Sequence, residues 1–259
     1  MDSGGIILFL FIGLVAGNMI GTIAWRLPLT ILQSIPADQT SPCLHLWLPG
    51  SRCCKCETPL AWYDNIPLFS WLYLQGKCRH CGYPVCWHYL LLEVICIAMA
   101  VLCYALHPQT ILLALALFLY FWFALTLSTI DIKHYLLPDK LTLPLLWLGL
   151  LFNTFTGMIR CEDAIAGAAA GYIILWLIYW VIRLIWHKEG LGYGDFKMLA
   201  AVGAWSGWQS LPIILYIASI AGVVYGLLLW FKEGRRGAPI PFGPALALSG
   251  WGYFCWISL

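Results

Sequence analysis

The chain has 259 residues, of which 62% are hydrophobic and only 10% are charged, and its mean hydropathy is +0.83. Soluble domains carry roughly 45–50% apolar and about 25% charged residues. This composition excludes an ordinary soluble globule and a disordered chain. The net charge of only +2 also excludes a basic nucleic-acid-binding protein, so no nucleic-acid partner is expected. What remains is the class of helical membrane proteins.

Apolar runs recur along the chain, and the first covers residues 6–27. No basic segment precedes this run and no small-residue cleavage site follows it, so we expect a retained membrane anchor and not a cleaved signal peptide. At roughly 20–25 residues per span, the chain outside the polar stretch 28–88 has room for about eight transmembrane helices. The further runs are 89–106, 111–130, 141–158, 164–186, 197–209, 211–231 and 241–258. We therefore expect an all-α polytopic membrane protein.

The distribution of Lys and Arg predicts its orientation. With the N-terminus outside, 13 of the 14 basic residues fall on the cytoplasmic side and only Arg160 falls outside. Lys and Arg concentrate in cytoplasmic loops, and seven or nine spans would put the later charges on the wrong side. We therefore expect eight spans, with the polar stretch 28–88 in the reducing cytoplasm.

That stretch contains two C-x-x-C pairs, Cys53–Cys56 and Cys78–Cys81, separated by 21 residues. On a reducing face this spacing favours metal binding over disulfides. Four thiolates complete a tetrahedral Zn²⁺ site, whose metal would supply much of the folding free energy of so small a loop. The alternative interpretation is that these four cysteines are free thiols that bind no metal. Cys54 offers a possible but poorer chelate with Cys56, and we expect small apolar fillers at Cys43, Cys86, Cys96, Cys103, Cys161 and Cys255.

Three acids lie against apolar runs on the expected cytoplasmic side: Asp131, Asp139 and Asp195. Ionisable groups at membrane depth are costly and are functional candidates. Two carboxyls brought close cannot both ionise cheaply, so a pair can hold one proton and one charge and activate water against a peptide bond. Most other acids, including Asp64 and Asp163, are interpreted as solvated loop charges.

Asp195 lies in a glycine-rich segment, Gly192-Tyr-Gly194-Asp195. The missing side chains of Gly192 and Gly194 would let an extended substrate approach the backbone closely. A second interpretation is purely structural: Asp131 would pair with Lys133, and Asp195 with Lys197, as interfacial anchors. The chemistry alone leaves both interpretations open.

Six elements in this order resemble the bacterial type IV prepilin peptidases, a family of GxGD-class intramembrane aspartic proteases. They are Trp25-Arg-Leu-Pro28, the two C-x-x-C pairs, Asp64-Asn-Ile-Pro67 with Ser70-Trp71, Asp131-x7-Asp139 containing Leu-Pro-Asp139, Gly192-Tyr-Gly-Asp195, and Pro241-Phe-Gly-Pro244. The resemblance covers nearly the whole chain.

The resemblance implies that Asp131 and Asp195 are the catalytic pair, with Asp139 the rival for the first position. It implies a multi-pass enzyme of the bacterial inner membrane that cleaves the basic leader of type IV prepilins or pseudopilins at the cytoplasmic face. It also implies methylation of the new N-terminus by S-adenosylmethionine, for which the sequence offers no binding residues. The expected parts are a first span (1–27), a cytoplasmic zinc loop associated with methylation (28–88) and a seven-span peptidase core (89–259).

One departure concerns methylation, because Gly21 stands where the family usually has asparagine. Two other functions stay open on sequence grounds. A proton-coupled transporter would use Asp131 and Asp195 as a relay, although transport sites usually lie at the midplane between repeats. A membrane thiol oxidoreductase would use the C-x-x-C pairs, although the charge distribution places them in the reducing compartment.

Overall fold

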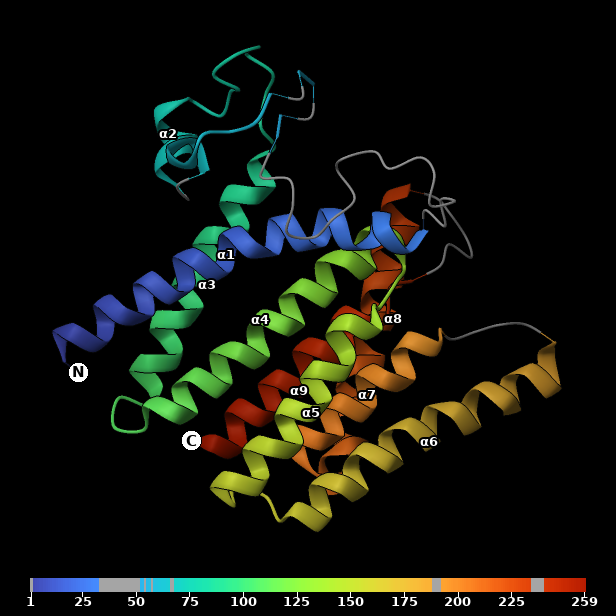
Figure 1. The fold of residues 1–259 in the computed structure, drawn as a ribbon. Helices are drawn as coiled ribbons and strands as arrows, with labels where there is room; N and C mark the ends of the chain where they lie inside the picture. Colours follow the sequence, from blue (N-terminus) through green and yellow to red (C-terminus); the bar gives the residue numbers. More distant parts are fainter. Residues whose placement is uncertain are drawn as a thin grey trace. The chain divides into compact units, whose positions relative to one another are not determined.

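The computed structural model describes residues 2–32, 52–53, 55–56, 58–65, 68–187, 192–233 and 240–259. Within these residues the fold is helical, with two isolated β-bridges, which confirms the expected fold class (Figure 1). The α-helices are α1 (Ser3–Leu32), α2 (Phe69–Tyr73), α3 (Trp87–Leu106), α4 (Ile111–His134), α5 (Asp139–Thr156), α6 (Cys161–Trp186), α7 (Tyr193–Ser206), α8 (Leu211–Glu233) and α9 (Gly243–Ser258). Two short 3₁₀ turns are Trp62–Asn65 and Trp208–Ser210.

Every apolar run of the sequence corresponds to one helix, α1 or α3 to α9. Five stretches of the described chain are long and apolar enough to cross a membrane: Ser3–Ile31, Trp87–Leu106, Ile111–His134, Cys161–Ile185 and Trp208–Phe231. Helices α5, α7 and α9 do not meet that criterion, so the count of eight spans stays a prediction.

By packing, the chain forms two units, Met1–Phe118 and Leu119–Leu259. In the first unit, α1 packs along α3 through glycines. A Cβ added to Gly17 would lie 2.7 Å from the Cα of Glu93, and one added to Gly21 would lie 2.5 Å from the ring of Tyr89. Such close approach of backbones is typical of helix pairs in membranes. Packing thus groups α3 with α1, whereas the expected boundary at residue 88 separates them. The expected division by function, into a first span, a zinc loop and a peptidase core, stays a prediction.

In the second unit, α7 lies among α5, α6 and α9 (Figure 1, α7 in orange). All its residues from Met198 to Ser206 are buried. Gly203 of α7 faces Gly167 of α6 so closely that a Cβ on either would collide with the carbonyl of the other. The indole N–H of Trp205 donates to the carbonyl of Leu145 on α5 at 2.9 Å. A short helix enclosed by protein in this way holds its N-terminal residues in a fixed position.

Candidate active site

Asp131 and Asp195 lie in the same region of the second unit. Asp131 is near the end of α4 and 5% exposed; its Oδ2 accepts the backbone N–H of Gly243, the first residue of α9, at 3.0 Å. Asp195 is in the first turn of α7 and 8% exposed; its Oδ2 accepts the N–H of Gly192 at 3.2 Å. Both acids adjoin the same side chain: Leu137 packs on Gly194, next to Asp195, and on Gly243, where an added Cβ would lie 2.7 Å from the Oδ2 of Asp131. The structure therefore brings the two expected catalytic acids together.

The local fold of Asp195 follows from its place at a helix start. Gly192 is the N-cap of α7, and Asp195 is the third residue of the helix. A carboxylate at that position reaches back to the N-cap N–H and interacts favourably with the helix dipole. Both effects hold the Asp195 side chain in one orientation.

Leu137 fills the space between the two acid-bearing segments. It belongs to the turn after α4, where Tyr135 adopts a left-handed conformation (φ 53°) and donates its N–H to the carbonyl of Asp131 at 2.9 Å. A Cβ on Gly194 would lie 2.7 Å from the Cβ of Leu137, and a Cβ on Gly243 would lie 3.0 Å from its Cδ2. One leucine thus packs on the glycines next to both aspartates.

The two expected substrate-binding glycines differ in their surroundings. Gly194 is pressed against Leu137, so packing within the protein accounts for its missing side chain. Gly192 is exposed, and a Cβ there would meet only the Oδ2 of Asp195, at 3.4 Å, and the N of Gly194, at 4.0 Å. A substrate-binding role stays a prediction for both.

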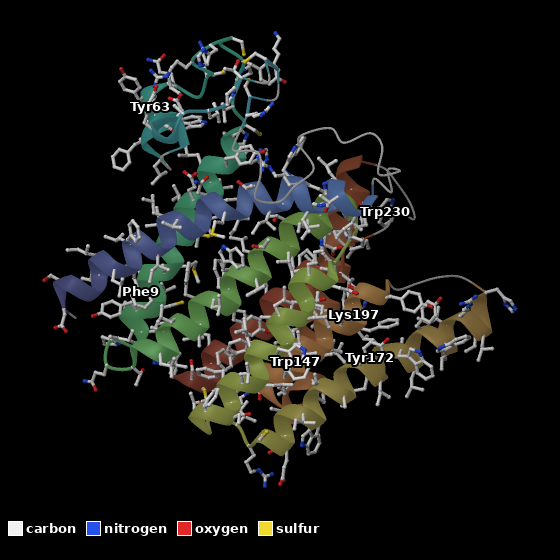
Figure 2. All side chains as sticks on the ribbon, viewed as in Figure 1. Phe9, Tyr63, Trp147, Tyr172, Lys197 and Trp230 are labelled. Carbon is white, nitrogen blue, oxygen red and sulfur yellow. The ribbon has the colours of Figure 1, made fainter. Side chains whose placement is uncertain are left out.

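Asp139 and Lys197 form an ion pair that sequence reasoning missed. The Nζ of Lys197, labelled in Figure 2, donates to both carboxylate oxygens of Asp139, at 2.6 and 2.7 Å. The suggested pair of Asp195 with Lys197 is therefore wrong. Residues two apart on a helix point away from each other. Asp195 and Lys197 are both on α7, and Asp131 and Lys133 are both on α4, so helix geometry argues against both suggested pairs.

The four cysteines of the expected zinc site also come together, in the first unit. The Sγ atoms of Cys53, Cys56, Cys78 and Cys81 all lie within 4.8 Å of one another, and those of Cys53 and Cys81 are 3.6 Å apart. A tetrahedral Zn²⁺ with Zn–S bonds of about 2.3 Å needs S–S separations of about 3.8 Å. The donor set and its spacing thus fit zinc.

The two cysteine pairs sit on matching knuckles. An isolated antiparallel bridge closes each one, Arg52 with Pro59 and Lys77 with Pro84. The second knuckle turns at Gly82, which has a φ of 64° and donates its N–H to the Cys78 carbonyl at 2.9 Å. These turns hold both thiols of each pair on one side.

Hydrogen bonds to sulfur favour thiolates in this cluster. The N–H groups of Cys56 and Lys55 lower the pKa of Cys53, the Thr58 hydroxyl lowers that of Cys56, and the N–H of Cys81 lowers that of Cys78. For Cys81, the N–H of Tyr83 lowers the pKa, but desolvation and the three neighbouring thiols outweigh it and raise the pKa to about 11. Four sulfurs this close need a cation before all of them can lose their protons.

Two interpretations of single residues in this loop are wrong. Asp64 is not a solvated charge: its side chain is 3% exposed and accepts two hydrogen bonds from the Arg79 guanidinium, at 2.7 and 3.0 Å. Cys86 is not an apolar filler, because it is exposed and its sulfur lies 2.9 Å from the Nδ1 of His88. Cys43 and Cys54 lie outside the described residues.

The fold and the site together define a class: helical membrane proteins with a pair of neighbouring, buried aspartates at the end of one helix and the start of another. Intramembrane aspartic peptidases belong to this class. Residues 117–227 match the type IV leader peptidase family, and residues 11–107 match the bacterial peptidase A24 N-terminal domain. The chain belongs to the type IV leader peptidase family.

Individual relatives support this assignment over nearly the full length. The chain is 44% identical to a prepilin leader peptidase/N-methyltransferase of Escherichia coli (strain K12), with 97% of each chain covered. It is 41% identical to proteins of the same name from Stutzerimonas stutzeri and Aeromonas hydrophila, over 95% and 96% of this chain and 89% and 90% of those relatives. No solved structure matches the chain.

Proposed function

We propose that this protein cleaves the basic leader peptide from type IV prepilins or pseudopilins at the cytoplasmic face of the bacterial inner membrane and then methylates the new N-terminus. Both activities appear in the names of its relatives. The single observation that carries the proposal is the pair of buried carboxyls within the family-matched residues 117–227, Asp131 and Asp195, whose neighbouring glycines pack on the same Leu137.

In the proposed mechanism, the two carboxyls share one proton, because two neighbouring carboxyls cannot both ionise cheaply. The charged member accepts a proton from a water molecule as that water attacks the scissile carbonyl. The protonated member donates its proton to the carbonyl oxygen. As the C–N bond breaks, the carboxyl that now holds the proton donates it to the leaving amine, and the other carboxylate accepts a proton from a hydroxyl of the tetrahedral intermediate, so the pair again holds one proton.

The backbone bonds to Asp131 and Asp195 prepare this step. Each carboxyl accepts an N–H at its Oδ2, from Gly243 and Gly192 respectively. A fixed carboxyl does not have to be oriented during the reaction, which lowers the entropic part of the barrier. The exposed surroundings of Gly192 suit an extended peptide that approaches Asp195, and the negative charge of the pair suits a basic leader.

The cysteine loop supports the methylating half in this proposal. Cys53, Cys56, Cys78 and Cys81 would hold a structural Zn²⁺, which when bound supplies the crosslink between the two knuckles. The methyl donor is S-adenosylmethionine, the usual donor for N-methylation. Loop and active site face the cytoplasm, as the distribution of basic residues predicts.

The test is cleavage of a synthetic prepilin by the full chain in membranes or detergent, with labelled S-adenosylmethionine present. Asp131→Asn and Asp195→Asn should each lower cleavage by at least about 10³-fold, because neither amide can exchange a proton with water in the catalytic step. Asp163→Asn, an acid of the same unit that pairs with Arg160, is the matched control and should cleave normally. Full activity in either of the first two variants would refute the dyad.

A further inference from the structure

We propose that the Asp139–Lys197 ion pair is a positioning clamp: it holds the turn after α4 against the start of α7 and so fixes the relative placement of the two catalytic carboxyls. The inference rests on the proposed function and adds two positioning residues to it. Neither Asp139 nor Lys197 is itself required to react.

The argument begins with where the pair lies. Asp139 is the first residue of α5 and follows directly on the turn that carries Leu137. Lys197 is on α7, two residues after Asp195. The ion pair therefore ties the segment after Asp131 to the segment after Asp195, and its own two residues are 58 apart in sequence.

A second contact acts at the same junction. Leu137 packs against Gly194, one residue before Asp195, and against Gly243, whose N–H binds Asp131. The turn is thus attached to α7 on both sides of Asp195: by an apolar contact at position 194 and by a charged contact at position 197. Two attachments fix a position and an orientation, whereas one would leave the turn free to pivot.

The geometry of the ion pair suits this role. One ammonium binds both oxygens of one carboxylate at 2.6 and 2.7 Å, and the pair lies at the surface, with the Lys197 side chain 30% exposed and that of Asp139 56% exposed. Exposed ion pairs contribute little to overall stability. Their value is local order, and a misplacement of about 1 Å between catalytic groups costs about 10²-fold in rate.

The test compares prepilin cleavage, as separate kcat and KM values, among full-length variants. Lys197→Met and Asp139→Asn should each lower kcat about 10²-fold and leave KM within about twofold. The charge swap Asp139→Lys/Lys197→Asp should regain at least tenfold in kcat over either single variant. Arg160→Met, which breaks the ion pair with Asp163, and Lys140→Met, which removes the lysine next to Asp139, are matched controls and should keep wild-type kcat.

Folding is checked independently by a thermal melt in detergent and by methyl transfer to a pilin that is already cleaved, and both should stay at the wild-type level. An unchanged kcat in Lys197→Met overturns the clamp. Loss of methyl transfer along with cleavage also overturns it, because the ion pair would then be needed for the fold as a whole. The clamp is also overturned if Asp139→Asn loses cleavage as completely as Asp131→Asn and the charge swap does not restore it. Asp139 would then be a reacting group. A wild-type chain that does not cleave prepilin refutes the proposed function instead.

Discussion

Gly194→Ala should damage cleavage through a steric effect whose size follows from the structure. The new Cβ would lie 2.7 Å from the Cβ of Leu137, and ordinary contact begins at 3.4 Å, so the two segments must separate by about 0.7 Å. Neither atom can rotate away, because each is a Cβ fixed to its backbone. Leu137 has little room to retreat, since its Cδ2 already lies close to Gly243.

Overpacking of this kind costs about 1–3 kcal/mol in stability. The larger effect falls on the reaction, because Leu137 is in the turn that follows Asp131 and Gly194 adjoins Asp195. A displacement approaching 1 Å between those carboxyls should lower kcat by up to about 10²-fold. The assay is prepilin cleavage together with a thermal melt in detergent.

The matched control is Gly252→Ala on α9, where a Cβ would meet nothing within 4 Å. Alanine is favoured over glycine in a helix by up to about 1 kcal/mol, so this variant should be as stable as wild type or more so and should cleave normally. If Gly194→Ala melts and cleaves like wild type, the contact between Leu137 and α7 does not hold the site as described.

Two further predictions concern the first unit. Cys78→Ser should reduce bound zinc, measured by elemental analysis, below one ion per chain and should lower methyl transfer more than cleavage; stoichiometric zinc in that variant would contradict the four-thiolate site. Gly21→Asn, which introduces the residue usual in the family, should destabilise the α1–α3 pair by about 1–3 kcal/mol, because its Cβ would lie 2.5 Å from Tyr89. Adding Tyr89→Ala should recover much of that loss in a thermal melt, and a Gly21→Asn variant as stable as wild type would contradict the packing.

The helices and the cysteine cluster could be predicted from sequence because their signals are local. A run such as 211–231 is apolar along its whole length, and the helix found there is Leu211–Glu233. The spacing of the C-x-x-C pairs is likewise visible in the sequence itself, and it predicts the cluster of four thiols. The number of spans was harder, because α7 is short and enclosed by protein, and hydropathy does not distinguish a helix buried in protein from one buried in lipid.

The partners of the acids could not be predicted in the same way, because they come from distant segments. Asp64 looked solvated in a polar stretch, yet Arg79, 15 residues later, covers it in the folded loop. Lys197 looked like a partner for Asp195 because the two are neighbours in sequence. Helical geometry could have rejected that pair, but nothing local indicates that Asp139 is the actual partner.

The same contrast explains why Asp131 and Asp139 were hard to rank from sequence. Both are acids at the edge of an apolar run, and only their partners differ. Asp131 is buried and accepts the backbone N–H of Gly243, and no basic side chain in the described part of the chain forms an ion pair with it. Asp139 is 56% exposed and neutralised by Lys197. A carboxyl that must exchange protons with a reacting water needs a buried environment without a bound cation, as at Asp131. A carboxylate held by an ammonium, as at Asp139, is suited to fixing the position of a segment. This difference favours Asp131 as the partner of Asp195.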